Sequence, residues 1–431
     1  MAEQAFNWRP TIRRRVLVAA AVFVLWTIGI EARLVYLQVF SHADLMERAD
    51  RQQNRTVEPP AKRGEIFDRK GRVLAYSVDA DTIAAVPTEI DHPAEVAAQI
   101  CGALDGCSPE RRQAIAKSLG RRASFAYIAR KITPEEAKRV RALALPGITL
   151  LKESRRYYPN SELAAHVVGY VGLDNVGLGG IESAYDSQIR GRDGKTLIQT
   201  DAKRHAIFSR VERPATAGAG VELTIDQYLQ HIAERELRVG VEENNAAAGT
   251  AIVMDPRTGE ILALANWPTY NPNAFGKADD DARRNRAIQS LYEPGSTFKI
   301  VTASAALEQN VITPETMVET SPGHITFQGR KPIYDTHHYG TIDFTDVIVK
   351  SSNVGAIKVG LRVGPQLLTD YVGRFGFGRT IAPDFRGETA GIVWSAARLD
   401  SSAVASISMG CLLYTSPSPR DRTRSRMPSS A

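Results

Sequence analysis

Residues 292–301 of the chain read Tyr-Glu-Pro-Gly-Ser-Thr-Phe-Lys-Ile-Val. A Pro-Gly pair cannot lie inside a helix but begins one well, so we place Ser296 in the first turn of a helix. Lys299 follows three residues later, and side chains at i and i+3 share one helix face with Cβ atoms roughly 5–6 Å apart. The spacing therefore predicts a hydroxyl and an amine side by side.

This pair of side chains suits acyl transfer. A serine hydroxyl becomes a good nucleophile when a neighbouring base takes its proton, and a lysine that burial keeps neutral is such a base. Free N–H groups at a helix N-terminus also stabilise an alkoxide and a tetrahedral oxyanion. A bare Ser-x-x-Lys arises by chance about once in a chain of this size. Here it occurs once only, after Pro-Gly and before an apolar helical run.

A second polar motif lies downstream, at Lys350-Ser-Ser-Asn353, before a helical run that begins at Val354. It holds the only Ser-x-Asn of the chain, Ser351 and Asn353. A second hydroxyl can relay a proton to a leaving amine, and a carboxamide can both donate to and accept from a peptide backbone. Alone, this motif would more simply be a helix cap. Together with Ser-x-x-Lys it predicts a catalytic site.

Composition limits the class of protein. A chain of 431 residues can form two or three domains, and its 43% hydrophobic and 24% charged residues are ordinary for a globular protein. The net charge of +6 is modest. No basic stripe with interleaved aromatic residues is present, which argues against nucleic acid as a partner.

The N-terminal region predicts a membrane anchor. Residues 16–30 carry no charge, follow Arg13-Arg14-Arg15, and lead into a second apolar run that ends at Phe40. An uncleaved signal anchor over 16–40 explains this better than a cleaved signal peptide, because the bulky residues of the second run leave no small-residue cleavage site. We expect residues 1–15 in the cytoplasm and everything from Ser41 onward across the membrane.

The region after the anchor shows mixed helix and strand patterns and nothing catalytic. We expect a juxtamembrane helix over 41–53 and a hairpin over 63–75 that turns at Asp68-Arg-Lys-Gly71. The glycines of segment 177–180 miss the spacing of a nucleotide-binding loop and predict a turn. We expect residues 41–221 to hold the later domain away from the membrane and to offer surfaces to partners.

A Pro-, Ala- and Gly-rich segment from Pro214 to Val221 predicts a domain boundary. A helix capped by Asp226 and a buried hairpin over 250–265 follow it. The Ser-x-x-Lys helix is expected to pack on the sheet of that hairpin. This order predicts an α+β domain over 222–410, with helices packed on an antiparallel sheet.

The cysteines and histidines suggest no framework or metal centre. Cys101 and Cys107 can pair across a short loop in an oxidising compartment, but two buried free thiols are our preferred interpretation. Asp335-Thr-His337-His338 suggests a metal ion at first sight. Adjacent histidines on an extended segment point to opposite faces, so we expect neither a metal site nor a cofactor.

The chain resembles the class B penicillin-binding proteins. The resemblance rests on the Ser-x-x-Lys and Ser-x-Asn pair, on Arg63-Gly-Glu-Ile-Phe-Asp-Arg-Lys-Gly71, and on their position behind a membrane anchor. Segments 339–355 and 387–391 look most like the septal, cell-division type. The resemblance covers residues from about 10 to about 410.

This resemblance implies a D,D-transpeptidase that cross-links peptidoglycan stem peptides through a serine acyl-enzyme and is acylated by β-lactams. Ser296 would be the nucleophile, Lys299 its base, Ser351 the proton relay and Asn353 a substrate contact. It also implies the inner membrane, with the catalytic domain outside the cytoplasm on a dimerisation-type pedestal. The implied partners are a septal glycosyltransferase and other division proteins.

The third motif of that family, Lys-Thr-Gly or Lys-Ser-Gly, does not occur in the sequence. Residues 411–431 show no helix or strand period and are rich in Ser, Pro and Arg. We expect the authentic sequence to stop near Gly410 and the last residues, from Cys411, to be foreign and disordered. The polypeptide as written is then expected to fold poorly and to be inactive, because groups that hold the substrate carboxylate and one oxyanion donor would be lacking.

Two other interpretations stay open. A membrane-anchored β-lactam sensor or a β-lactamase-related protein also acylates the serine of Ser-x-x-Lys, although the long region 41–221 argues against it. A non-catalytic division scaffold would act through the anchor and that same region. Support of septation by a Ser296→Ala version of the full-length parent would favour the scaffold.

Overall fold

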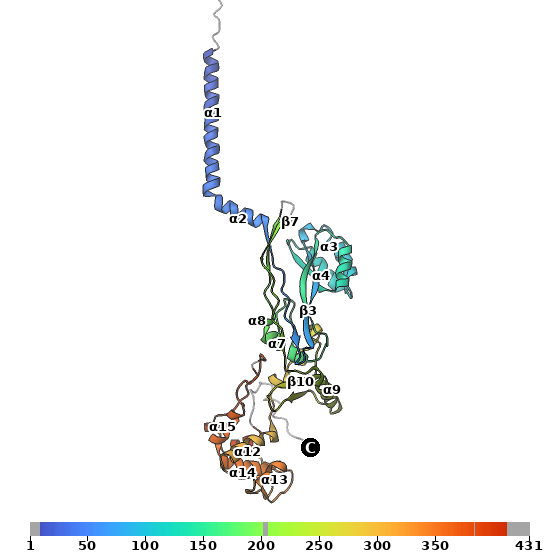
Figure 1. The fold of residues 1–431 in the computed structure, drawn as a ribbon, viewed down its shortest axis with the longest axis vertical. Helices are drawn as coiled ribbons and strands as arrows, with labels where there is room; N and C mark the ends of the chain where they lie inside the picture. The colour runs from blue at the N-terminus through green and yellow to red at the C-terminus, as the bar shows by residue number, and fades with distance from the viewer. Residues whose placement is uncertain (1–8, 201–205, 383, 412–431) are drawn as a thin grey trace, which may run out of the picture.

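The computed structural model describes residues 9–200, 206–382 and 384–411. Residues 1–8 of the expected cytoplasmic segment and 412–431 of the expected foreign tail lie outside the described residues. Figure 1 shows an elongated arrangement, in which a long N-terminal helix leads to a stalk of paired strands with a lobe at its side, and a helical lobe lies at the far end.

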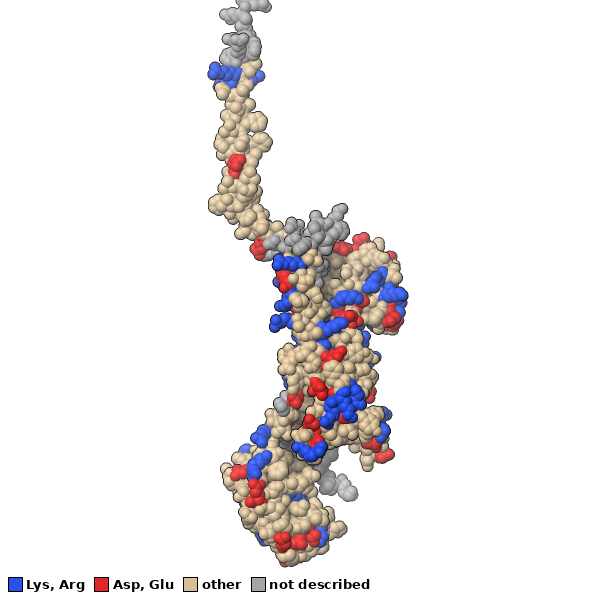
Figure 2. Space-filling view, in the orientation of Figure 1, with Lys and Arg blue, Asp and Glu red and all other residues tan. Residues whose placement is uncertain are grey.

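The N-terminal helix is long and apolar enough to span a bilayer, by length and composition, over the 29 residues Ile12–Phe40. It consists of α1 (Arg9–Val35) and the π-helical turn η1 (Tyr36–Phe40), and α2 (His42–Gln53) follows it. Its apolar side chains are exposed, and Figure 2 shows them as a long surface with little charge. The helices expected over 16–40 and 41–53 are both present.

Two sheets build the stalk. A three-stranded antiparallel sheet has the order β1-β6-β7, with β1 (Asn54–Val57), β6 (Lys195–Thr200) and β7 (Ala206–Arg213). A second sheet has the order β4-β3-β2-β8, with β5 also paired to β3. Its strands are β2 (Ile66–Phe67), β3 (Val73–Ala85), β4 (Ala126–Ile132), β5 (Ile148–Tyr157) and β8 (Val221–Glu222).

The hairpin expected over 63–75 is the antiparallel pair β2 and β3, with Ile66 opposite Ala75. Its turn is fixed by Asp68, whose Oδ1 accepts hydrogen bonds from the backbone N–H groups of Lys70 at 2.9 Å and Arg72 at 2.8 Å. Gly71 has a φ of 72°, a left-handed conformation that glycine adopts without a steric penalty. Local sequence therefore determines this turn.

A lobe of three helices covers the β3-β4-β5 part of the second sheet (Figure 1). The helices are α3 (Pro93–Ala103), α4 (Pro109–Leu119) and α5 (Pro134–Ala142). Thr133 and Glu136 form a capping box at the start of α5. Buried side chains from α3 and α4, among them Ile100, Ile115 and Leu119, form the core of this lobe against the sheet.

A disulfide joins Cys101, near the end of α3, to Cys107 in the loop before α4. Our preference for two free thiols was therefore wrong. The chain reverses tightly through Gly106, at a φ of 62°, and brings the two Cα atoms to 5.5 Å. That separation lies inside the range in which a disulfide forms without backbone movement.

Replacing both cysteines by serine, Cys101→Ser with Cys107→Ser, should lower the free energy of unfolding of this lobe by about 2 kcal/mol. The reason is that the closed loop no longer restricts the unfolded chain. Hydrogen exchange of the α3 and α4 amides measures the effect, and Cys411→Ser is the control because Cys411 is the free cysteine. Equal exchange in the double variant and the parent would contradict the prediction.

The hairpin expected over 250–265 is present as β9 (Gly249–Met254) and β10 (Ile261–Trp267). The helix before it is α9 (Gln227–Glu243), whose N-cap Asp226 accepts a hydrogen bond from the N–H of Tyr228 at 2.9 Å. The expectation of a buried hairpin holds for β10 only, since Ile252 and Met254 of β9 are 51% and 55% exposed. Helix α9 packs mainly on β10, and β9 pairs with no other strand among the residues that the structure describes.

Most of the remaining elements form the far lobe, whose core combines buried apolar side chains of helices α12 to α16 with Val318 and Ile342 from two short strands. The Ser-x-x-Lys helix, α12 (Lys299–Glu308), packs against α14 and α15 and not on the β9-β10 sheet as expected. The physical reason is that the buried apolar face of α12, which carries Val301, Ala305 and Ala306, packs against other helices. The other helices of this lobe are α13 (Phe344–Val349), α14 (Asn353–Val363), α15 (Pro365–Arg374) and α16 (Ser401–Ser408). Two short helices precede it, α10 (Asp280–Arg283) and α11 (Arg286–Gln289), and α11 packs on β9 and β10.

Short strands and turns connect these helices. Strand β11 (Met317–Glu319) pairs with β14 (Thr341–Asp343), and β12 (His324–Ile325) pairs with β13 (Ile333–Tyr334). The 3₁₀ turns of the described residues are η2 (Pro87–Glu89), η3 (Pro272–Lys277), η4 (Gly295–Phe298) and η5 (Ala396–Arg398). Three short helices lie in the stalk: α6 (Ala165–Val168), α7 (Gly180–Ala184) and α8 (Asp186–Ile189). The turn expected around 177–180 is present before α7. The expected α+β class is correct.

Candidate active site

Ser296 lies in the turn η4, immediately before α12 begins at Lys299. The expected helix start is present, as a tighter 3₁₀ turn. The N–H of Gly295 donates to the oxygen of Gly410 at 3.1 Å, and a Cβ placed on Gly410 would lie 1.9 Å from the oxygen of Gly295. Glycine at 410 is thus required for this close approach. The Ser296 side chain is exposed, so a substrate can reach it.

Lys299 is buried, at 2% exposure, and its amine is held by the second motif. The Nζ atom donates to the Ser351 backbone oxygen at 2.6 Å, to Ser351 Oγ at 3.0 Å and to Asn353 Oδ1 at 2.9 Å. Three of the four residues selected from the sequence therefore meet at one amine. The Ser296 hydroxyl makes no hydrogen bond to this group within the described part of the chain.

Burial lowers the pKa of Lys299 from 10.5 to about 8, although the negative charge of Asp335 and the thiol of Cys411 both act to raise it. An amine with this pKa is neutral in about one molecule in ten at pH 7, compared with fewer than about one in a thousand at the ordinary value. A base is most effective when its pKa lies near the working pH. The environment of Lys299 therefore prepares its amine to accept a proton.

The Ser-x-Asn motif forms the turn before α14. Ser352 is the cap, because its Oγ accepts a hydrogen bond from the N–H of Gly355 at 2.9 Å. Ser351 has a left-handed backbone with a φ of 56° and faces the amine of Lys299. Asn353 also donates from Nδ2 to the oxygen of Tyr334 at 3.0 Å. Ser352 therefore caps α14, while Ser351 and Asn353 of the same motif bind the amine of Lys299.

Asp335 is the site residue that the sequence analysis missed. Its carboxylate accepts hydrogen bonds from Ser352 Oγ at 2.7 Å and from the N–H of Val354 at 3.0 Å, as well as from the N–H of Asn353. It holds the start of α14 and so fixes Ser351 and Asn353 against Lys299. We had considered Asp335 only as part of a metal motif, and no local pattern indicates its contact with a turn 17 residues later.

The two histidines beside Asp335 contact different neighbours. The ring of His337 contacts Tyr339, and the ring of His338 lies over Gly323. Across residues 9–200, 206–382 and 384–411, no group of three or more His, Cys, Asp and Glu side chains is placed to hold a metal ion.

An exposed serine at a helix start, with a buried lysine next to a Ser-x-Asn turn, defines a serine-type acyl-transfer enzyme of the penicillin-binding class. Two family descriptions match the chain: "Penicillin binding protein transpeptidase domain" over residues 249–418 and "Penicillin-binding Protein dimerisation domain" over residues 58–223. The chain belongs to the penicillin-binding proteins that are peptidoglycan D,D-transpeptidases. Members of this family act on peptidoglycan and bind β-lactams.

Relatives cover most of the chain. The probable peptidoglycan D,D-transpeptidase PenA of Neisseria meningitidis is 35% identical over 398 residues, which are 91% of this chain and 67% of PenA. The peptidoglycan D,D-transpeptidase FtsI of Escherichia coli is 33% identical over 416 residues, 95% of this chain and 69% of FtsI. Penicillin-binding protein PBP2 of Helicobacter pylori, solved in complex with MreC, shares the fold with a TM-score of 0.69 at 23% identity, over 84% of this chain and 74% of that one.

Proposed function

We propose that this chain is a septal peptidoglycan D,D-transpeptidase in which Ser296 is acylated, Lys299 is its base, Ser351 relays a proton and Asn353 contacts the substrate. One observation carries the proposal: the buried Lys299 amine lies within hydrogen-bonding distance of Ser351 Oγ and Asn353 Oδ1. The septal role is supported by similarity to FtsI of Escherichia coli.

In the acylation step, the neutral Lys299 amine takes the proton of Ser296 while Ser296 Oγ attacks the carbonyl carbon of the penultimate D-alanine. The N–H groups at the start of α12 stabilise the negative charge on the carbonyl oxygen. The C–N bond then breaks, and a proton passes from Lys299 through Ser351 Oγ to the leaving D-alanine nitrogen. An amine of a second stem peptide attacks the resulting ester and releases Ser296. A β-lactam follows the first step, because its amide opens on the same serine.

The membrane assignment rests on the N-terminal helix and on the cysteines. An apolar span over Ile12–Phe40 after three arginines supports a single-pass anchor with residues 1–15 in the cytoplasm. A disulfide at Cys101 supports an oxidising compartment for the rest of the chain. We therefore assign the catalytic domain to the outer side of the inner membrane.

The division of the chain supports two functional parts. The matched ranges 58–223 and 249–418 support a division into a pedestal, for which we propose residues 41–221, and a transpeptidase domain, for which we propose residues 222–410. PBP2 of Helicobacter pylori, which shares the fold, forms a complex with MreC. For this chain we propose the pedestal as a surface for a septal glycosyltransferase and other division proteins.

The rate of acylation by a penicillin should rise with pH up to about 8 and then level. The reason is that only the neutral amine of Lys299, whose pKa burial lowers to about 8, can accept the proton of Ser296. In Asp335→Asn the rising limb should move to lower pH, because a negative charge that raises the pKa of Lys299 is removed. Stopped-flow measurement of the acylation rate of the detergent-solubilised chain between pH 5.5 and 10 tests both expectations.

The matched control is Asp346→Asn, since Asp346 pairs with Lys350 on the exposed side of α13 and does not contact Lys299. Its profile should match that of the parent. A parent profile that is flat around pH 8, or a limb that does not move in Asp335→Asn, would rule out Lys299 as the base.

A further inference from the structure

A small pocket lies at the junction of the pedestal and the transpeptidase domain, with a volume of about 260 Å³. Strands β4 and β5, the turn at 171–173 and the turn η3 form its walls. Four basic residues line it, Arg130, Lys131, Arg155 and Arg156, and none of the lining residues is acidic. A cavity with only positive side chains among its charged groups favours an anion.

Lys131 lines the pocket, and a bound anion would change the protonation and pairing of its amine. Its backbone is left-handed, with a φ of 53°, which is uncommon for a residue with a side chain. Its Nζ donates to Asn175 Oδ1 at 2.7 Å, and it forms no ion pair within the described part of the chain. Burial lowers its pKa to about 8, opposed by the charges of Glu153 and Asp174 and reinforced by those of Arg130 and Arg155.

The two neighbouring arginines of β5 differ in their access to the pocket. Arg156 has a side chain that is 3% exposed, and its Nη2 is fully buried without a hydrogen-bond partner in the described structure, so a ligand does not reach it, whereas Arg155 is half-buried. The Nε of Arg156 is bound to Glu182 Oε1. Arg155 takes part in no ion pair among residues 9–200, 206–382 and 384–411. By contrast, Glu153 and Asp174 neutralise Arg130.

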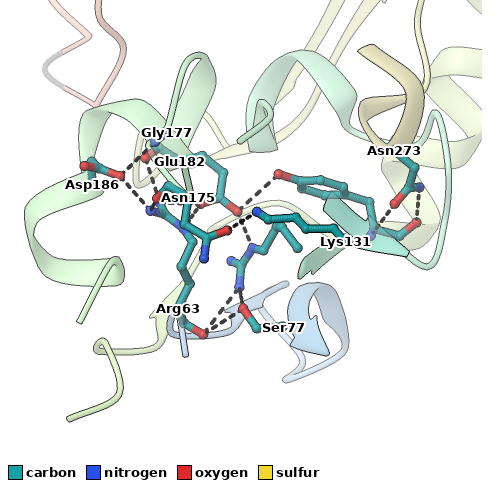
Figure 3. A network of polar contacts seen from close by, with 10 residues as sticks. Arg63, Ser77, Lys131, Asn175, Gly177, Glu182, Asp186 and Asn273 are labelled. Atoms are coloured by element: carbon teal, nitrogen blue, oxygen red, sulfur yellow. Dashed lines mark hydrogen bonds and ion pairs between the residues drawn. The ribbon is translucent and has the colours of Figure 1, made fainter. Parts of the chain in front are cut away.

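The pocket also lies where the pedestal and the transpeptidase domain are joined by hydrogen bonds. Asn273 of η3 accepts a hydrogen bond from the N–H of Tyr158 at 3.0 Å and donates from Nδ2 to the Tyr158 oxygen at 2.8 Å. Figure 3 shows Asn273 at one end of a polar network that runs past Lys131 and Glu182 to Asp186. A ligand in this pocket therefore touches β4 and β5 of the pedestal and η3 of the transpeptidase domain together.

We propose that this pocket binds a small oxyanion, a carboxylate or phosphate group, that bridges Lys131 and Arg155. The oxygens give the Arg155 guanidinium an anionic partner and place negative charge beside the half-buried amine of Lys131. Binding also links the pedestal to η3. The site is separate from Ser296 and does not depend on the proposed transpeptidase chemistry.

Calorimetric titration of the detergent-solubilised full chain with inorganic phosphate, and separately with acetate, tests the proposal and distinguishes the two sources. We expect saturable binding of at least one probe and a loss of affinity of about tenfold in Arg155→Gln, since one charge-assisted contact is removed. Arg121→Gln is the control, because Arg121 is exposed and does not line the pocket. Equal weakening in both variants, or no saturable binding of either probe, would overturn the proposal.

The pH dependence provides a second readout. Acetate stays an anion throughout, so its affinity should fall as pH rises from 7 to 9, while Lys131 loses its proton around pH 8. Lys131→Met should remove this dependence and keep the weak binding to Arg155. Hydrogen exchange should show slower exchange of the amides of 171–173 and η3 when phosphate is added. An affinity that does not change with pH in the parent, or unchanged exchange of both turns, would count against the site.

Discussion

Fluorescent penicillin should label the chain at Ser296, and the label should be lost completely in Ser296→Ala. The reason is that the acyl group is carried by the hydroxyl of Ser296, which the substitution removes. Complete loss in the variant follows because no other hydroxyl lies at the start of α12 with a lysine three residues later.

The measurement is a time course of labelling on gels, with FtsI of Escherichia coli as the positive control. Ser401→Ala is the matched variant, because Ser401 is an exposed serine at the start of another helix, α16. It should label as the parent does. Label retained in Ser296→Ala would remove Ser296 as the nucleophile.

The same variant separates an enzyme from a scaffold in cells. If this chain acts through transpeptidation, Ser296→Ala should fail to support septation in a strain that depends on it. A scaffold that acts through the anchor and the pedestal would keep its function in that variant. Slow release of the bound penicillin distinguishes a transpeptidase from a β-lactamase-related protein, which releases it quickly.

Local patterns predicted the elements whose ends are coded by neighbouring residues. The β2-β3 hairpin follows from Asp68 and Gly71, which form their turn with contacts no more than four residues apart. Helix α9 follows from the cap at Asp226. The packing of α12 on other helices could not be predicted, because a largely apolar helix fits a sheet or another helix equally well. The disulfide depended on a reversal at Gly106 that no periodicity indicates.

The candidate site divides in the same way. Ser296 and Lys299 were found because their relation is set by one helical turn, and Ser351 and Asn353 because they form a local motif. The contact of Lys299 with Ser351 spans 52 residues and was inferred from the pairing of the two motifs and from the family resemblance. Asp335 was missed because its role exists only once β13 and α14 are side by side. A lone aspartate before a His-His pair gives no signal of helix capping.

Glu182→Ala should destabilise the stalk by about 3–5 kcal/mol, the largest stability loss that we expect from a single substitution in this chain. Glu182 is completely buried and holds two buried guanidinium groups, with Oε2 bound to Arg63 Nη2 at 2.6 Å and Oε1 bound to Arg156 Nε at 2.5 Å. Figure 3 shows Arg63 directed at both Glu182 and Asp186. The substitution leaves the buried guanidinium groups of Arg63 and Arg156 without the carboxylate that both of them bind. The cost comes from this uncompensated burial and exceeds the value of any single hydrogen bond.

Urea denaturation followed by circular dichroism measures this loss, with Asp79→Ala as the matched control. Asp79 pairs with Lys62 in the same stalk, but the side chains are 69% and 54% exposed, so removing the carboxylate should cost no more than about 1 kcal/mol. Glu182→Gln should lie between the two, since an amide oxygen can still accept one guanidinium hydrogen bond while the charge is lost. If Glu182→Ala and Asp79→Ala shifted the midpoint equally, burial of the network would contribute nothing. The residues of segment 63–71 would then be explained by formation of the β2-β3 turn alone.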